Sequence, residues 1–370
     1  MKRIFGIAVI GMVAVLAAPL SAQLGQLGKA VKKADQAKKV ADAVDALIFT
    51  DAEKLALGKQ VSDKLRLRYG VVQDKAVHKY VTLVGTMVAQ ASGKSSIPWK
   101  FIVLDTDGVN AYAAPGGFIH ITRGALSLLQ NESELADILG HEIAHVTEDH
   151  TVNAIKKGKM VELGAEMSRS QVLSAVADKS YEILFEGLYN RDDENDADAK
   201  GIVFANTAGY APGGLGAFLT RLAERNKDQA ERNGLFASHP ETKDRIARLA
   251  KQVSGQKLAS TALVAARYKA AITYKPVAIT QIAQLTAGAS GLAGSGSAAK
   301  PADTKSGSKL GVGKLGAALG AEKKSTSTVA SAGARGGVPD RDAKGGPNSA
   351  IVTITITAAE IAEFKKGIVG

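Results

Sequence analysis

The residues best suited to chemistry form one short run, His141-Glu142-Ile143-Ala144-His145. On a helix, residues four apart lie about 40° apart around the axis, so both imidazoles would face one side, a turn apart. Two imidazoles at that spacing can bind one zinc ion, and the glutamate beside them can take a proton from a zinc-bound water. The run therefore indicates a zinc hydrolase, although five residues of these types also occur together by chance.

A catalytic zinc site needs a third protein ligand and one open position. A third histidine ten residues after His141 is excluded, because Thr151 stands there. His150 follows His141 by nine residues. On a continuous helix that spacing places it about 180° around the axis, away from the same ion. The sequence therefore favours a carboxylate from a later helix as the third ligand.

Glu194 is the best-placed carboxylate, in the segment Glu-Asn-Asp-Ala-Asp. Asp198 follows it by four residues and shares its helix face, where it can accept the free N–H of a ligand histidine and fix its tautomer. The small Gly201 allows this helix to pack closely against the histidine helix. Two rival carboxylates, Glu182 and Glu186, have no aspartate four residues on. Without the histidine motif, such an acidic cluster is more often a solvated helix face.

Two further features fit a protease cleft. Residues 110–117 lead into a predicted strand, Phe118–Thr122. This strand could pair with a protein or peptide substrate in extended conformation, although an ordinary glycine-rich hairpin is the alternative. His239, just before Pro240, could donate a hydrogen bond to the oxyanion of a tetrahedral intermediate, as could Tyr189. A surface histidine that caps a helix would have the same sequence context.

Local signals place the other elements around these groups. A capping box at residues 50–53 opens a helix toward Arg68, and Asn131 begins the helix that carries the His-Glu run to about His150. The remaining predicted elements are helices over 74–88, 152–188, 194–208, 217–225 and 239–249, and strands over 98–104 and 118–122. On the last of these helices the apolar positions face inward, which leaves Arg245 available to other groups.

Length and composition limit the class of protein. The chain has 370 residues, of which 45% are apolar and 22% charged, enough for a globular core. It has no cysteine, which excludes disulfides, thiolate metal sites and cysteine nucleophiles. The net charge of +11 would suit nucleic acid or an anionic membrane as a partner. Nucleic acid is disfavoured, because aromatic and basic residues are not interleaved.

The first 22 residues have the three parts of a secretory signal peptide. Lys2 and Arg3 precede an apolar run over 4–16, and small residues follow up to Ala22. The run is short for a membrane span, which needs about 20 residues. We therefore expect cleavage after Ala22, no transmembrane span in the mature chain and export to a bacterial periplasm. Secretion from the cell and an uncleaved anchor are the alternatives.

The sequence outside the predicted central domain (50–255) divides into further parts. Residues 23–49 predict an amphipathic helix, and residues 256–287 a helical or extended extension. Residues 288–348 hold 14 of the 39 glycines, with nine basic and four acidic residues. They are typical of a solvated linker, or alternatively of an anchor to anionic lipid or cell-wall polymer. Residues 349–370 predict a strand and a helix that are too short to fold alone, so we expect them to dock on the body or on an envelope partner.

Several motifs in a fixed order form a more specific pattern than the histidine run alone. They are Asn110…Pro115-Gly116-Gly117, Thr122-Arg123-Gly124-Ala125-Leu126, Asn131…Glu134-Leu135-Ala136, His141-Glu142-Ile143-Ala144-His145, Arg191…Glu194…Ala197-Asp198 and His239-Pro240…Arg245. This set resembles the HtpX/BepA/Oma-type zinc metalloproteases of peptidase family M48, in their soluble exported branch. The resemblance covers about residues 50–252 and departs mildly from the family pattern at Ala125 and Asn190.

The resemblance implies a mainly α (α+β), gluzincin-like metalloprotease domain, with an active-site helix and a small sheet whose edge strand lines the cleft. It implies one Zn2+ per chain, with His141, His145 and Glu194 as ligands. Glu142 would be the general base and acid, and Asp198 the second acidic residue of the site. The expected function is a zinc metalloendopeptidase that cleaves misfolded or misassembled proteins of the bacterial envelope. The alternative is a largely latent protease that acts as a periplasmic chaperone or assembly factor through its C-terminal tail.

Overall fold

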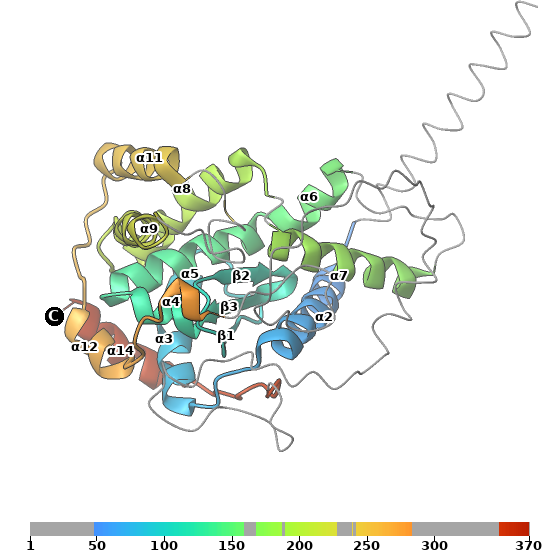
Figure 1. Cartoon of the computed structure of the whole chain (residues 1–370), viewed down its shortest axis with the longest axis horizontal. Coiled ribbons are helices and arrows are strands. Elements are labelled where there is room, and N and C mark those ends of the chain that lie inside the picture. Colours follow the sequence, from blue (N-terminus) through green and yellow to red (C-terminus); the bar gives the residue numbers. More distant parts are fainter. Residues whose placement is uncertain are drawn as a thin grey trace, which may run out of the picture. The chain divides into compact units, whose positions relative to one another are not determined.

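The computed structural model describes residues 48–158, 168–186, 189–227, 239, 242–282 and 348–369 (Figure 1). The predicted signal peptide, and nearly all of the predicted N-terminal helix and of the glycine-rich linker, lie outside these residues. Within the described ranges, no helix has the length and apolar character needed to cross a membrane.

The described chain is mainly helical with one small sheet, which confirms the predicted fold class. Its elements are α2 (Asp51–Tyr69), α3 (Lys75–Ala91), β1 (Lys100–Leu104), β2 (Ala111–Ala114), η1 (Pro115–Gly117), β3 (Phe118–Thr122), α4 (Arg123–Leu128), α5 (Glu132–Thr147), α6 (His150–Gly158), α7 (Arg169–Glu186), α8 (Arg191–Thr207), α9 (Gly214–Arg225), α11 (Thr242–Gly255), α12 (Ala265–Ala271), η2 (Ile279–Gln281) and α14 (Ala358–Val369).

Side chains at the predicted caps begin three of the helices. At the start of α2 the Thr50 hydroxyl accepts the Glu53 N–H at 3.3 Å, and the Glu53 carboxylate accepts the Thr50 N–H at 2.9 Å. Asp74 accepts two N–H groups in the first turn of α3, and Asn131 accepts one in the first turn of α5. Because these bonds satisfy donors that a helix leaves unpaired, the local sequence determines where the helices begin.

The sheet has the strand order β1-β3-β2, with β3 parallel to β1 and antiparallel to β2. Strands β1 and β3 are confirmed, but β2 was not predicted, because its sequence Ala-Tyr-Ala-Ala contains one residue of high strand propensity. β3 pairs with a neighbour on each side, so its backbone is not open to a further strand. The prediction that substrate pairs with Phe118–Thr122 is therefore wrong, and β2 is the sheet edge that contacts α5.

Helix α5 is buried along nearly its whole length and contacts α3, α8, α9 and β2 (Figure 1). α8 crosses α5 at two glycines, Gly140 and Gly201. A Cβ placed on Gly201 would lie 2.5 Å from the backbone nitrogen of His141, and one on Gly140 would lie 2.5 Å from the Gly201 carbonyl oxygen. Only residues without a side chain allow the two backbones to come so close.

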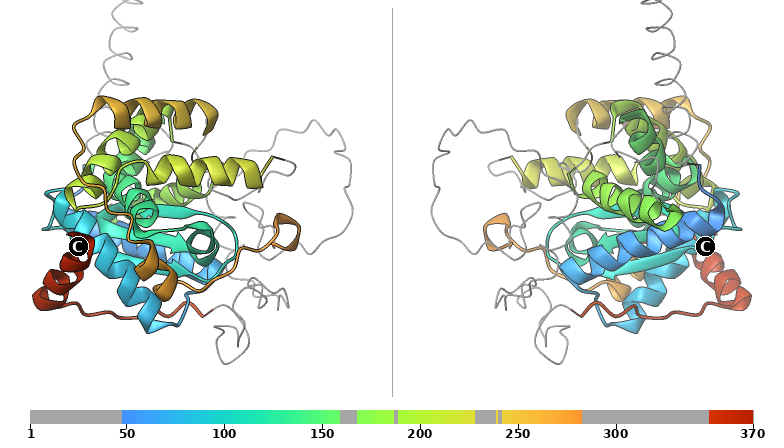
Figure 2. Two further views of the ribbon diagram at one scale, coloured as in Figure 1. Left: turned by 90° about the vertical axis from the view of Figure 1, so that its left-hand side faces the viewer. Right: turned by 90° about the vertical axis from the view of Figure 1, so that its right-hand side faces the viewer.

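The C-terminal segment lies on the body of the protein, where α14 contacts α3 (Figure 2). Ile368 of α14 is 3% exposed, and the rings of Phe364 and Tyr80 pack edge to face at 6.1 Å. Residues 351–357 alternate between half-buried apolar and exposed threonine side chains, as the sequence predicts, apart from the exposed Ile351. They pair with no strand of the described chain, however, so the predicted strand is an unpaired extended segment.

Candidate metal centre

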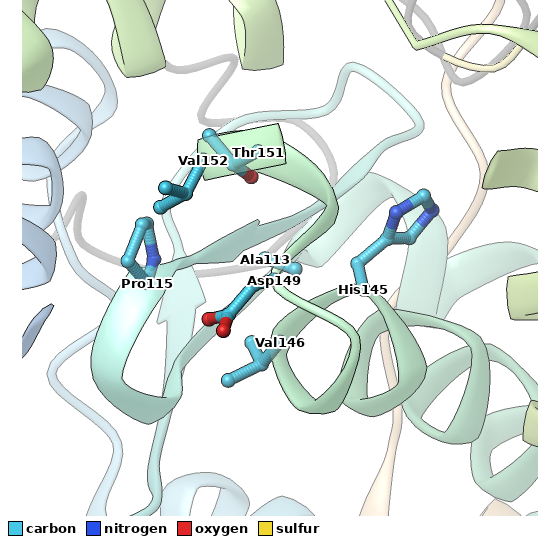
Figure 3. Close-up of a pocket in the computed structure, with 7 residues that line it drawn as sticks. All are labelled: Ala113, Pro115, His145, Val146, Asp149, Thr151 and Val152. Carbon is cyan, nitrogen blue, oxygen red and sulfur yellow. The ribbon is translucent and has the colours of Figure 1, made fainter. Parts of the chain in front are cut away.

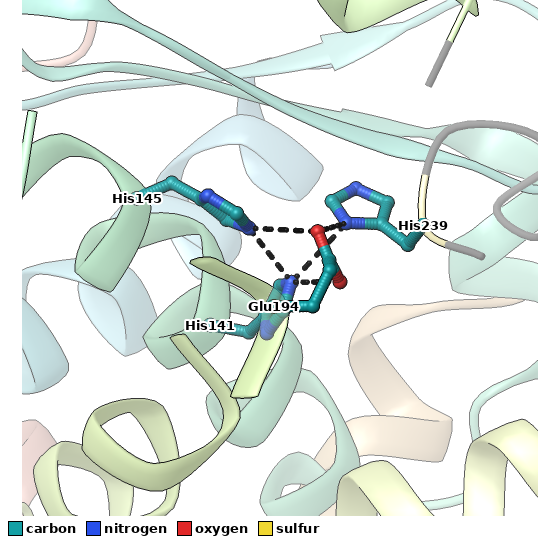
Figure 4. Close-up of side chains that lie close together, drawn as sticks. All are labelled: His141, His145, Glu194 and His239. Carbon is teal, nitrogen blue, oxygen red and sulfur yellow. Dashed lines mark hydrogen bonds and ion pairs between the residues drawn. The ribbon is translucent and has the colours of Figure 1, made fainter. Parts of the chain in front are cut away.

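Helix α5 supplies the three residues of the His-Glu run to one buried site. His141, Glu142 and His145 are each at most 2% exposed. The Nε2 atoms of the two histidines lie 3.1 Å apart, and their rings meet edge to face at 4.7 Å (Figure 4). The i, i+4 spacing therefore brings both imidazoles to one point, as the sequence predicts.

Helix α8 places Glu194 against both histidines. Its Oε1 lies 3.4 Å from His145 Nε2, and its Oε2 lies 3.6 Å from His141 Nε2. The close crossing at Gly201 permits this approach, because Glu194 lies two turns before that glycine on the same helix. The rival Glu182 forms an ion pair with Lys179 on α7 instead, and the side chain of Glu186 lies outside the described part of the structure.

His239 adds a third imidazole to the group. Its Nδ1 lies 2.7 Å from Glu194 Oε1 and 3.3 Å from His141 Nε2 (Figure 4). One donor atom from each of His141, His145, Glu194 and His239 falls within 4.8 Å of the others. The sequence prediction gave His239 an oxyanion role, whereas the geometry places its nitrogen among the donor atoms.

The donor set fits a zinc ion. Donor atoms about 2.1 Å from a tetrahedrally bound zinc lie about 3.4 Å apart, close to the spacings described above. Burial, reinforced by the charge of Arg245, lowers the pKa of His141 to about 3, so this imidazole is neutral, as a metal ligand must be. In the described structure Glu142 Oε1 has no hydrogen-bond partner, although it is buried. Buried polar atoms of this kind require a partner, which a cation or a water would supply.

Arg245 and Asp198 contact two members of the cluster, His141 and Glu194. Asp198 Oδ1 lies 3.0 Å from His141 Nδ1, where it can accept the N–H of this histidine. Arg245 donates to both oxygens of Asp198, at 2.6 and 2.8 Å, and its Nη1 lies 3.1 Å from Glu194 Oε2. Burial alone would raise the pKa of Asp198, but the guanidinium outweighs it and holds that pKa below its usual value.

The buried position of Arg245 corrects the expectation that this side chain stays available. It is 1% exposed, on the face of α11 that also carries the buried Leu249. The four-residue spacing of Arg245 and Leu249 was the signal that sequence reasoning missed, because residues four apart share a helix face.

Glu142 lies beside the cluster with its carboxylate near His239. Its Oε1 is 3.7 Å from His239 Nε2. Burial raises the pKa of Glu142 to about 7, so the group can both accept and release a proton near neutral pH. This is the property required of a general base that later acts as an acid.

His150 is not on the far side of the helix, contrary to the sequence prediction. The prediction assumed a continuous helix to about His150, but α5 ends at Thr147 and Asp149 has a positive φ of 55°. After this break α6 begins, and His150 Nδ1 lies 3.0 Å from His145 Nδ1. Asp149 was the local signal for the break, because aspartate commonly precedes the first turn of a helix.

Tyr189 packs against His145. Its ring stacks on His145 with centroids 4.3 Å apart, and its hydroxyl lies 2.7 Å from the Thr151 hydroxyl. A small pocket opens beside His145, between the end of β2 and the junction of α5 and α6 (Figure 3). Its lining residues are Ala113, Pro115, His145, Val146, Asp149, Thr151 and Val152. The edge strand β2 therefore ends close to the candidate metal centre.

The sequence around this site matches a known protein family. The model of peptidase family M48 matches residues 75–253. Residues 75–253 form a peptidase family M48 domain. This M48 domain contains all of the residues of the candidate metal centre, from His141 to Arg245, while α12 and α14 lie outside it.

Relatives of the M48 domain include three bacterial and plant proteins. The beta-barrel assembly-enhancing protease of Escherichia coli strain K12 is 23% identical over 207 residues, 53% of this chain and 42% of its own length. Metalloprotease YcaL of the same strain is 25% identical over 183 residues, 46% of this chain and 69% of its own. The mitochondrial metalloendopeptidase OMA1 of Arabidopsis thaliana is 24% identical over 180 residues, 49% of this chain and 37% of its own. The chain thus spans about two-fifths of the first and third of these relatives.

Proposed function

We propose that this protein is a zinc-dependent metalloendopeptidase of the bacterial cell envelope, which cleaves misfolded or misassembled envelope proteins. The observation that carries the proposal is the buried convergence of His141, His145, Glu194 and His239, with Glu142 beside them. The names of the relatives support a protease, and one of them names beta-barrel assembly. The predicted signal peptide supports a periplasmic location.

His141, His145 and Glu194 would hold the metal. A bound zinc ion supplies Lewis acidity, which polarises a peptide carbonyl and activates a water for attack. Asp198 orients His141 by accepting its Nδ1–H, so that Nε2 keeps its lone pair for the metal. Arg245 keeps Asp198 ionised and fixes its position through two hydrogen bonds.

Glu142 would carry the proton of the reaction. Its carboxylate takes a proton from the attacking water and then delivers it to the nitrogen of the leaving amine. A pKa raised by burial to about 7 suits both steps, because neither the gain nor the loss of the proton is then strongly disfavoured.

The substrate would enter as an extended strand along β2. Main-chain hydrogen bonds to an edge strand hold a peptide irrespective of its sequence, which suits a protease that acts on unfolded segments. The shared pocket of Ala113 and His145 supports this choice of edge, because it places the end of β2 beside the metal ligands.

A second candidate function is a largely latent protease that serves as an assembly or quality-control factor through residues 349–370. The position of His239 favours it. With His239 Nδ1 among the donor atoms, four protein groups surround the metal position, whereas a catalytic zinc keeps one position open. Substrate would then have to displace His239 before cleavage.

The test uses the full-length protein with an unfolded protein such as casein as substrate. Glu142→Gln should keep one zinc per chain by elemental analysis and lose cleavage, because the amide cannot accept the proton. Glu194→Ala should lose zinc. Glu182→Gln is the matched control, since the partly exposed Glu182 on α7 pairs with Lys179 and not with the cluster. Cleavage by purified Glu142→Gln, or full zinc occupancy in Glu194→Ala, would contradict the assignment.

A further inference from the structure

The second metal-binding histidine has a partner that the proposed mechanism does not use. His145 points its Nε2 at the cluster, and on the other side of the ring its Nδ1 lies 3.0 Å from Nδ1 of His150. His150 is 5% exposed, and its Nε2 lies 3.3 Å from Oδ2 of Asp196 on α8. The three side chains therefore form a line that ends at a carboxylate.

The protons along this line can be assigned from the chemistry of the groups. If His145 Nε2 binds a metal, its proton must sit on Nδ1, which can only donate. His150 Nδ1 must then accept, so the single proton of a neutral His150 sits on Nε2, where it faces the Asp196 carboxylate. Each atom in the line has one role, and Asp196 favours the tautomer of His150 that His145 needs.

The break between α5 and α6 is what makes this contact. A continuous helix would carry His150 to the opposite side of the axis from His141. Instead Asp149 takes a positive φ, and its carboxylate is held by Lys54 at 2.6 Å. Lys200 pairs with both Asp196 and Glu148, at 2.9 and 2.6 Å, which ties the break to α8.

The arrangement parallels the support of the other ligand histidine. His141 Nδ1 faces the Asp198 carboxylate directly, whereas His145 Nδ1 reaches the Asp196 carboxylate through an intervening imidazole. Both carboxylates come from α8, which also carries Glu194. One helix would thus supply a ligand and set the orientation of both ligand histidines.

We propose that His150 and Asp196 are positioning residues that fix the tautomer and ring orientation of His145 and thereby raise its affinity for the metal. This inference rests on the proposed zinc site. Partners of this kind change metal affinity by about 10- to 100-fold when they are removed. They act on the metal through His145 and touch neither the metal nor the substrate.

The test measures zinc affinity of the full-length protein by competition with a chelator, and the visible spectrum of the Co2+-substituted protein. His150→Leu removes the acceptor and should weaken zinc binding by about 10- to 100-fold and shift the Co2+ spectrum. His150→Asn carries an oxygen near the place of Nδ1 and should restore most of the affinity. Asp196→Asn should weaken binding in the same direction by a smaller factor. Asp192→Asn is the matched control, one turn earlier on α8 and exposed, and should behave as the wild type.

Each outcome bears on the proposal. Unchanged affinity and spectrum in His150→Leu, or equal losses in His150→Asn and His150→Leu, would overturn it, because packing alone would then explain the contact. If His150→Leu does not fold, Asp196→Asn against Asp192→Asn decides, since the Asp196 side chain is 38% exposed. A wild-type protein that binds no zinc would refute the proposed function together with this inference, whereas a wild type that binds zinc beside unchanged variants would refute this inference alone.

Discussion

Substitution of Gly201 by alanine tests whether the crossing of α5 and α8 builds the metal centre. The added Cβ would lie 2.5 Å from the backbone nitrogen of His141 and 2.8 Å from the Gly140 carbonyl carbon. Neither neighbour is the end of a flexible side chain, so the two helices must separate. Ordinary contact begins near 3.4 Å, so the required displacement is about 0.9 Å.

Two opposing effects determine the stability of Gly201→Ala. Alanine is favoured over glycine inside a helix by about 1 kcal/mol. Insertion of a methyl group into a packed interface costs about 1–3 kcal/mol. Repulsion should at least cancel the gain, and we expect a net loss of up to about 2 kcal/mol in the free energy of unfolding. A shift of about 1 Å at Glu194 and Asp198 should in addition lower cleavage by about 100-fold and weaken zinc binding.

The assay is urea unfolding and chelator competition on the full chain, with Gly216→Ala as the matched control. Gly216 is inside α9, where a Cβ would meet only Leu249 Cβ at 4.0 Å. The control should therefore gain about 0.5–1 kcal/mol from helix propensity alone and keep its zinc. If Gly201→Ala is as stable as Gly216→Ala and binds zinc as tightly as the wild type, the argument that close backbone contact positions Glu194 is refuted.

Two further predictions concern groups outside the metal centre. Burial lowers the pKa of His120 to about 3 from 6.5, so below pH 6.5 the unfolded chain gains a proton that the folded chain does not, and stability falls. Between pH 7 and pH 5 this group should lower the free energy of unfolding by about 2 kcal/mol. Urea unfolding of His120→Gln should therefore depend less on pH than that of the wild type. An equal pH dependence in both proteins would contradict the sign or the size of the effect. Arg267 donates to the fully buried Glu132 at 2.5 and 2.6 Å and stacks on Phe364 at 3.9 Å. The substitution Arg267→Met should therefore lower the free energy of unfolding by about 3 kcal/mol and speed hydrogen exchange over α14. Unchanged exchange over α14, measured by mass spectrometry, would show that Arg267 does not hold that helix.

Local rules explain what the sequence predicts well. The caps at Thr50, Asp74 and Asn131 use hydrogen bonds within three residues, so neighbouring sequence is sufficient to predict them. The four-residue spacings of His141 and His145 and of Glu194 and Asp198 are likewise properties of single helices. The expectation that the two pairs lie together rests on the ligands that zinc requires, and the structure brings these side chains together.

What the sequence does not predict depends on contacts between distant segments. β2 is a strand because β3 pairs with it, although its own alanines have little strand propensity. The central position of β3 follows from the pairing with both neighbours and has no local signature. The spacing of Arg245 from Leu249 indicates only that the two share a helix face. Burial of the charged group depends on the two carboxylates of α8 that neutralise it, which no sequence pattern on α11 reveals.

Burial of Arg245 between Asp198 and Glu194 has a consequence for electroneutrality. With Glu142 ionised, the site holds three negative charges and one positive charge away from solvent, a sum of −2. A divalent cation brings the sum to zero, whereas a monovalent ion leaves one negative charge and a trivalent ion leaves one positive charge. Because uncompensated buried charge is costly, binding of a divalent ion would favour the folded state. At a free ion concentration 100 times the dissociation constant, the folded state would gain about 2.7 kcal/mol. The supply of the ion in the surrounding compartment would then set how much of the protein is folded.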